Sequence, residues 1–198
     1  MKKIAIIAAI FSLVLIGAFS LSEYMARQLY PQKTSAPMQL GNPFNLVSHT
    51  GEAINEQAFQ GMPSAVFFGF THCPEVCPTT LNDLTVLRDQ LQAAGGEFNI
   101  FFITLDPERD TVTVLKDYIP YFGQGITGIT GVPEAVHELA RSWGIFWQKN
   151  NVTDQGYNID HTATVFLLDS KGRFKGTIDF HESREVAFKK LERLTATN

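Results

Sequence analysis

The sequence has few cysteines and no excess of positive charge, and both shortages narrow the possible functions. Only 2 of its 198 residues are cysteines, which excludes a scaffold held by several disulfides and a four-thiolate zinc site within one chain. Lysine and arginine number 16 against 20 aspartates and glutamates. A broad phosphate-binding surface needs the opposite balance, so we expect no nucleic-acid partner. The apolar fraction of 44% and the 16 phenylalanines indicate a folded core rather than a disordered chain.

The first 22 residues differ from the rest of the chain. They carry charge only at Lys2 and Lys3, before an uncharged apolar stretch at 4–22. This stretch is slightly longer than a signal-peptide core and close in length to a membrane-spanning helix. We therefore expect residues 1–22 to be a membrane anchor, with a cleaved signal peptide as the alternative because AFS at 18–20 offers a small-residue cleavage site. The two lysines predict that the remaining chain lies outside the cytoplasm. Because no Arg/Ser-rich transit peptide precedes the apolar stretch, we expect a bacterial inner (cell) membrane protein with its domain in the periplasm.

The rest of the chain reads as a linker followed by one domain. Residues 23–43 are polar and contain three prolines, which is typical of a flexible linker, and residues 44–198 form the predicted domain. Short apolar runs predict strands at 64–71, 98–105, 162–168 and 173–180. Helical spacing and turn residues predict helices at 78–94, 111–121, 133–143 and from about 183. This order of elements predicts an α/β fold, a thioredoxin-like sandwich in which helices flank a central mixed sheet.

Both cysteines lie in THCPEVCPTT, residues 71–80, where the first predicted strand passes into the first predicted helix. Free N–H groups and the positive dipole end of a helix N-terminus stabilise a thiolate and lower its pKa. The four-residue offset puts Cys73 and Cys77 on one face of a helical turn, with Cα atoms roughly 6 Å apart. Such a pair can bind a soft metal ion or close into a redox-active disulfide. The alternative is two passively buried cysteines, which the flanking prolines and the junction disfavour.

Four motifs along the chain carry a family resemblance. They are FFGFTHCPEVCPTTLNDL at 67–84, TLDPERDT at 104–111, GITG at 128–131 and DHTATVFLLDSKGRF at 160–174. Together they resemble the Sco/SenC family of membrane-tethered, thioredoxin-like copper proteins that act in cytochrome c oxidase assembly. The resemblance implies that copper is bound by the two cysteines of the first motif and by the histidine of the last. In this sequence these residues are Cys73, Cys77 and His161.

This donor set is chemically suited to copper. Two thiolates suit Cu(I) and imidazole suits either oxidation state, so the set can hold copper through a redox change. Tetrahedral zinc also accepts two cysteines, a histidine and a water, so zinc stays open. His161 is distant from Cys77 in the sequence, hence only the fold can bring them together. We expect His161 at the start of the third predicted strand, on the edge near the thiols.

Two functions from different classes stay open. The leading one is a copper chaperone that delivers copper to the binuclear copper site of the copper-bearing subunit of cytochrome c oxidase. A second copper chaperone is a candidate donor. The rival is a thiol–disulfide reductase that acts on the cysteines of that site or of another periplasmic partner, which requires an accessible thiol of low pKa. Only the first function has an evident need for His161, and the resemblance implies that both activities coexist.

Other candidate residues receive structural interpretations. Three histidines are expected to be ordinary surface or core residues: His49, His137 and His181. His72 adjoins Cys73 and could tune its thiolate, but consecutive side chains usually point apart. Asp106 is expected to be a turn or helix-cap residue, with support of the thiol site as the alternative. Five phenylalanines at strand positions are expected to pack in the core: Phe67, Phe68, Phe70, Phe101 and Phe102.

Overall fold

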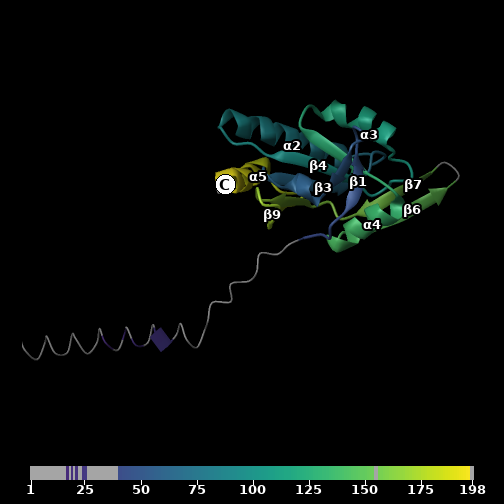
Figure 1. The fold of residues 1–198 in the computed structure, drawn as a ribbon. Helices are drawn as coiled ribbons and strands as arrows, with labels where there is room; N and C mark the ends of the chain where they lie inside the picture. The colour runs from purple at the N-terminus through teal and green to yellow at the C-terminus, as the bar shows by residue number, and fades with distance from the viewer. Residues whose placement is uncertain are drawn as a thin grey trace, which may run out of the picture. The chain divides into compact units, whose positions relative to one another are not determined.

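The structure is a computed structural model that describes residues 17, 19, 21, 24, 25, 40–153 and 156–196. The predicted anchor and linker lie largely outside these residues. Among the residues described, no helix is both long enough and apolar enough to cross a membrane. The chain divides into two units, Met1–Ala36 and Pro37–Asn198, and the second unit carries the fold shown in Figure 1.

A mixed sheet forms the centre of this unit (Figure 1). Its strands are β1 (Asn45–Ser48), β2 (Ala53–Asn55), β3 (Ser64–Gly69), β4 (Asn99–Thr104), β5 (Ile126–Thr130), β8 (Val165–Leu168) and β9 (Phe174–Ile178). They run in the order β2-β1-β5-β4-β3-β8-β9. The three central strands are parallel, and the outer pairs are antiparallel. A separate antiparallel pair is formed by β6 (Trp147–Thr153) and β7 (Gly156–His161).

The central strands carry the core on both faces of the sheet. β3 (SAVFFG) and β4 (NIFFIT) are parallel neighbours and are buried almost throughout, as expected for strands covered on both sides. Because side chains alternate along a strand, Phe67 and Phe102 face one layer of the core, whereas Phe68 and Ile103 face the other. The five phenylalanines predicted to lie in the core are all buried.

Helices cover both faces of the sheet in the described part of this unit. They are the α-helices α2 (Val76–Ala93), α3 (Val112–Tyr118), α4 (Pro133–Ser142) and α5 (Arg184–Ala196) and the 3₁₀-helices η1 (Glu56–Phe59) and η2 (Ile119–Phe122). Leucines of α2 and α5 pack on one face, and Val136 and Leu139 of α4 pack on the other. α2 begins at Val76 rather than at Pro78 as predicted. Pro78 fits inside the first turn because the N–H groups of that turn have no partner within the helix, so a residue without an N–H is tolerated there.

Several strands were not predicted, and one of them corrects the prediction for His161. β1, β2 and β5 are short, while β6 (WQKNNVT) and β7 (GYNIDH) are polar, so no apolar run marks them. Ile159 is the buried residue of β7. His161 ends β7 instead of beginning the third predicted strand, and β8 starts only at Val165. The histidine therefore belongs to a hairpin outside the main sheet.

Candidate metal centre

The junction between β3 and α2 places the two cysteines. β3 ends at Gly69 and α2 begins at Val76, so Cys73 lies in the connecting loop and Cys77 in the first helical turn. Cys73 is partly exposed, whereas Cys77 is buried. A Cβ atom at Gly69 would lie 2.8 Å from Sγ of Cys77. Glycine is therefore needed for the thiol to pack against the end of β3.

The two thiols differ in acidity. The pKa of Cys73 falls from 9.0 to about 4, chiefly because the thiol of Cys77 donates a hydrogen bond to its sulfur. The backbone N–H of Cys77 also donates to this sulfur, at 3.4 Å. The pKa of Cys77 is raised by the same contact with Cys73 and by burial. At neutral pH the pair is thus a partly exposed thiolate beside a buried thiol. The lowered pKa predicted for a helix N-terminus is found for Cys73, mainly through the Cys77 thiol, but not for Cys77 in the first helical turn, whose pKa is raised.

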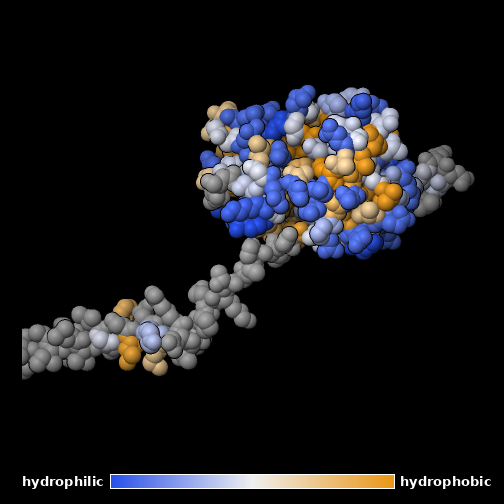
Figure 2. All heavy atoms as spheres, viewed as in Figure 1, coloured by the Kyte–Doolittle hydropathy of each residue, from blue (hydrophilic) through white to orange (hydrophobic). Residues whose placement is uncertain are grey.

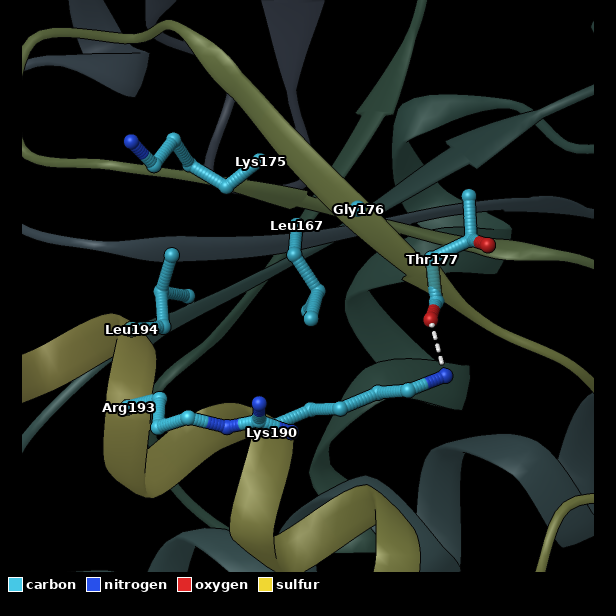
Figure 3. A pocket seen from close by; sticks show the side chains of 7 residues that line it. All are labelled: Leu167, Lys175, Gly176, Thr177, Lys190, Arg193 and Leu194. Atoms are coloured by element: carbon cyan, nitrogen blue, oxygen red, sulfur yellow. Dashed lines mark hydrogen bonds between the residues drawn. The ribbon is translucent and has the colours of Figure 1, made fainter. Parts of the chain in front are cut away.

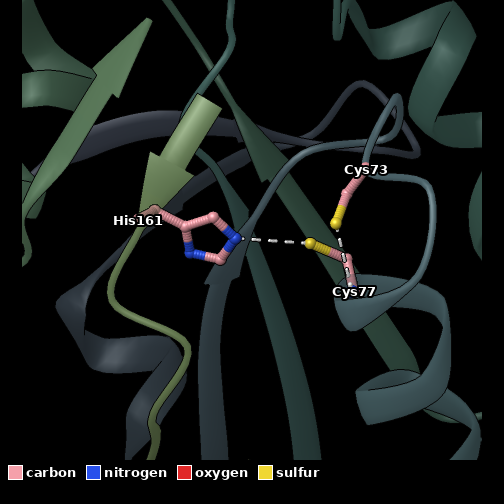
Figure 4. A group of neighbouring side chains, drawn as sticks. All are labelled: Cys73, Cys77 and His161. Carbon is pink, nitrogen blue, oxygen red and sulfur yellow. Dashed lines mark hydrogen bonds between the residues drawn. The ribbon is translucent and has the colours of Figure 1, made fainter. Parts of the chain in front are cut away.

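His161 points its imidazole ring at the thiols (Figure 4). Its Nε2 atom lies 3.6 Å from Sγ of Cys77. Its Nδ1 atom lies 2.9 Å from the carbonyl oxygen of Thr162, which can only accept a hydrogen bond, so Nδ1 carries a proton and Nε2 is the ring nitrogen directed at the sulfur. The ring packs against Phe67 and Phe70, at centroid distances of 6.2 and 5.8 Å. The fold therefore sets both the orientation and the tautomer that a metal ligand needs.

The structure brings together the three residues that the sequence singled out. Their two sulfurs and one imidazole nitrogen lie within 4.8 Å of one another. Cys73 and His161 line a cavity of about 290 Å³ together with Glu75 and Asp160, both exposed. Two sulfur donors and an imidazole fit a soft or borderline ion such as copper or zinc. Binding would require Cys77 to lose its proton, because the thiolate is the ligating form.

Asp110 is a buried carboxylate that contacts the loop before Cys73. Its Oδ2 atom accepts from the N–H of Thr71 at 3.0 Å and from the hydroxyl of Thr104 at 2.6 Å, and its Oδ1 atom accepts from the hydroxyl of Thr71 at 2.5 Å. Burial raises the pKa of Asp110. The exposed ring of His72 has its Nδ1 atom 3.0 Å from Oγ1 of Thr71. That nitrogen is therefore engaged with Thr71 rather than with Cys73.

Asp106 combines the turn role favoured by the sequence with a contact to the hairpin. Its carbonyl oxygen accepts from the N–H groups of Arg109 and Asp110, at 3.1 and 2.8 Å. Its buried carboxylate accepts from Nε of Arg109 and from the hydroxyl of Tyr157, the latter at 2.6 Å. Since Tyr157 lies on β7, Asp106 contacts the strand that ends in His161.

Three residues that contact the site's two segments were missed by sequence reasoning. Arg109 and Asp110 belong to the TLDPERDT motif, where four charged residues beside a buried strand end were the available signal. Tyr157 lies in a polar segment that gives no comparable signal. The other histidines take structural positions, with contacts to Gly128 for His49, Trp147 for His137 and Phe180 for His181.

A larger cavity, of about 430 Å³, lies between β9 and α5 (Figure 3). Its lining residues are Leu167, Lys175, Gly176, Thr177, Lys190, Arg193 and Leu194. The amine of Lys190 already donates to the carbonyl oxygen of Thr177 at 2.8 Å and to Glu182 at 2.6 Å. In Figure 3 the amines of Lys175 and Lys190 point to opposite sides. The cavity thus lacks the converging polar groups of a ligand site, and the cysteine–histidine cluster is the better candidate.

The fold and this cluster define a class of protein: a thioredoxin-like α/β sandwich whose thiol pair and histidine converge as a candidate soft-metal site. The chain belongs to the SCO1/SenC family, since the model of that family matches residues 32–196. It is 36% identical over 139 residues to a SCO2-like protein of Rickettsia prowazekii, covering 69% of this chain and 68% of that protein. It is 32% identical over 179 residues to the mitochondrial protein SCO1 homolog of Homo sapiens, covering 87% of this chain and 59% of that protein.

Solved structures agree with the family assignment. ScoI of Bradyrhizobium japonicum with copper bound is 36% identical, with a TM-score of 0.70 and coverage of 78% of this chain and 99% of that one. ScoI of Arabidopsis thaliana with copper bound is 29% identical, with a TM-score of 0.76 and coverage of 80% and 99%. The likeness supports the central mixed sheet flanked by helices. Because the chain spans about three fifths of the human relative, activities of that whole protein do not transfer directly.

Proposed function

We propose that this protein binds copper through Cys73, Cys77 and His161 and delivers it to the binuclear copper site of cytochrome c oxidase during assembly. The observation that carries the proposal is the convergence of the three donor atoms within 4.8 Å. Further support comes from membership in the SCO1/SenC family and from the two ScoI relatives, whose solved structures hold copper.

The geometry suits capture and release of copper by ligand exchange. The thiolate of Cys73 is partly exposed and is the first donor that an arriving ion meets. Cys77 loses its proton as the ion binds, and His161 supplies the third donor through Nε2, the ring nitrogen that faces the thiols. An ion that takes four ligands would keep one position for a further donor besides Cys73, Cys77 and His161, and Cys73 and His161 line the cavity through which that donor would arrive. A ligand of the partner can enter there before the thiolates leave, and a second copper chaperone can load the site by the same route in reverse.

The surface beside the site offers an apolar contact for the oxidase's copper-bearing subunit. Phe146 is 58% exposed, and its N–H donates to the hydroxyl of Thr162, the residue after His161. Figure 2 shows hydrophobic residues gathered among hydrophilic ones on the half of the unit that carries α3 and β7. Exposed apolar patches often mark protein–protein contacts. We therefore propose that the subunit docks beside the site, where the exposed Phe146 offers an apolar contact next to Thr162 and His161.

Removal of the imidazole tests the delivery function. His161→Ala should weaken Cu(II) binding most, because the imidazole is the donor best suited to that state, while Cu(I) persists on the two thiolates. Bound metal is measured in protein purified anaerobically with reduced thiols, and oxidase activity is measured in cells grown at limiting copper. We expect the wild type to hold stoichiometric copper and the variant cells to lose assembled oxidase. His49→Ala is the matched control, because His49 contacts Gly128 instead of the thiols.

The opposite result would favour the second function, a thiol–disulfide reductase. The low pKa and partial exposure of Cys73 support this function. In that reaction the thiolate of Cys73 attacks a partner disulfide and releases one partner thiolate. Cys77 gives its proton to the released partner thiolate and attacks the sulfur of Cys73 in the mixed disulfide. A Cys73–Cys77 bond forms, the second partner sulfur leaves as a thiolate, and the partner gains two electrons. Cells with His161→Ala that assemble fully active oxidase at limiting copper would contradict delivery and leave the reductase as the better account.

We also propose that residues 4–22 anchor the protein in the bacterial inner membrane with the domain in the periplasm. The uncharged length of this stretch and the preceding Lys2 and Lys3 support this orientation. A reporter that works only in the periplasm should be active when fused after Asn198. Activity of a cytoplasmic reporter at the same position would overturn the orientation, and release of a soluble form beginning near residue 21 would show cleavage instead.

A further inference from the structure

One short turn contacts both segments that carry the candidate metal ligands. It comprises residues 106–110, between β4 and α3. At one end, the carboxylate of Asp110 accepts from both the N–H and the hydroxyl of Thr71, at 3.0 and 2.5 Å. Thr71 precedes Cys73 by two residues. The turn therefore fixes the entrance of the thiol loop through two hydrogen bonds to a buried charge.

At its other end, the same turn holds the β6–β7 hairpin through Tyr157. The hydroxyl of Tyr157 donates to Oδ1 of Asp106 at 2.6 Å. Nη1 of Arg109 donates to the carbonyl oxygen of Tyr157 at 3.0 Å, and the guanidinium lies over its ring at 3.7 Å from the centroid. Tyr157 precedes His161 by four residues on β7. Arg109 and Asp106 are themselves paired through Nε and Oδ2, so these contacts form one connected group.

The turn itself is tied to the main sheet. The hydroxyl of Thr130 on β5 donates to the carbonyl oxygen of Asp110 at 2.7 Å. The N–H of Asp106 donates to the hydroxyl of Thr104 on β4 at 2.9 Å.

Among the strands that the structure describes, β7 pairs with β6 and shares no ladder with the main sheet. His161 also lies four residues before Val165, which pairs with Phe67 on β3. Ile159 of β7 is buried in the core. The contacts of Tyr157 therefore add to this backbone connection in setting the distance from His161 to the thiols.

We propose that Tyr157 and Arg109 are positioning residues that hold His161 at ligand distance from Cys73 and Cys77. This inference rests on the proposed copper-binding function. When the contact of Tyr157 with Asp106 is made, the centre offers two sulfurs and an imidazole. When it is broken, the hairpin is held less firmly, by Ile159 in the core and by the remaining contact of Arg109, while Asp110 still holds the thiol loop, so the imidazole spends less time at ligand distance. The contact thereby favours Cu(II) over Cu(I) at this site, because imidazole is the donor that Cu(II) needs.

Tyr157→Phe removes the hydroxyl and keeps the ring beneath Arg109. The loss leaves Oδ1 of the buried Asp106 without this donor, so the contact weakens while the stacking remains. Loss of a group hydrogen-bonded directly to a metal ligand typically lowers metal affinity 10- to 100-fold, and Tyr157 acts on His161 through the strand, so the low end of this range applies. We expect Cu(II) affinity to fall about tenfold and Cu(I) affinity less than about twofold. Tyr121→Phe is the matched control, since Tyr121 is 86% exposed.

The experiment uses the full-length protein in detergent and has two readouts. Competition titrations give the Cu(I) and Cu(II) affinities, and electron paramagnetic resonance reports nitrogen coupling to Cu(II). Amide hydrogen exchange of the metal-free protein gives the second readout. In Tyr157→Phe, amides of residues 156–161 should exchange faster, whereas those of β3 and β4 should not change.

Distinct outcomes overturn the inference and the function on which it rests. Unchanged Cu(II) affinity with unchanged exchange in Tyr157→Phe would overturn the positioning role. Equal losses of Cu(I) and Cu(II) affinity, with faster exchange in the main sheet, would show a merely structural role and would also overturn it. If the wild type binds no copper, the proposed function fails. The exchange of residues 156–161 then decides alone whether Tyr157 holds the hairpin.

Discussion

The two segments that meet at the metal centre are held in different ways. The thiol loop connects β3, a fully buried central strand, to α2, whose leucines fill the core. The β6–β7 hairpin is a separate pair of strands on which Ile159 is the buried residue of β7. Apolar burial and the backbone ladder of β3 therefore place Cys73 and Cys77. His161 is placed by fewer contacts, which are the burial of Ile159, the packing of its own ring against Phe67 and Phe70, and the polar contacts of Tyr157.

This difference separates the two candidate chemistries. Thiol–disulfide exchange uses only the segment that the core fixes. Copper binding through three ligands uses that segment and the hairpin together. Changes in the hairpin should therefore alter copper binding while leaving thiol chemistry intact, and changes at the thiols should alter both.

The largest effect that the comparison predicts concerns the thiol loop, the segment that the core fixes, and the acidity of Cys73 in it. With a pKa of about 4, Cys73 is a thiolate above that pH and becomes protonated only as the pH falls through 4. Its rate of alkylation by iodoacetamide should therefore stay nearly constant between about pH 8 and pH 6, where an ordinary thiol slows roughly 100-fold. Mass spectrometry identifies the labelled cysteine, and we expect Cys73 to be labelled well before the buried Cys77.

The matched control removes the donor that lowers this pKa. In Cys77→Ala the sulfur of Cys73 loses the thiol hydrogen bond that is the main cause of its acidity. Its pKa should rise, so its labelling rate should fall as the pH is lowered. A steep fall in the wild type as well would mean that the thiol loop does not stabilise a thiolate, and the reductase alternative would lose its main support.

The same difference explains what the sequence could predict. Phe67 and Phe102 lie in apolar runs that mark buried strands, and Cys73 and Cys77 share a motif at a strand–helix junction, so local pattern sufficed for them. His161 was found through its motif, but its place at the end of β7 was not, because the polar hairpin has no apolar alternation. The contact of Tyr157 with Asp106 joins residues far apart in the chain, and no local pattern encodes it.

The smallest effect is predicted for the exposed edge of the hairpin. Nζ of Lys149 on β6 lies 2.5 Å from Oε2 of Glu108, and the two side chains are 37% and 52% exposed. Exposed ion pairs contribute about 0–1 kcal/mol, so Glu108→Gln should lower the free energy of unfolding by less than about 1 kcal/mol, as measured by urea titration. Glu108 also accepts from the hydroxyl of Tyr157, but at 3.3 Å against 2.6 Å for the buried Asp106. Cu(II) affinity should therefore change less than about twofold. If Glu108→Gln weakened Cu(II) binding as much as Tyr157→Phe, the exposed pair rather than the buried carboxylate would be what holds His161 in place.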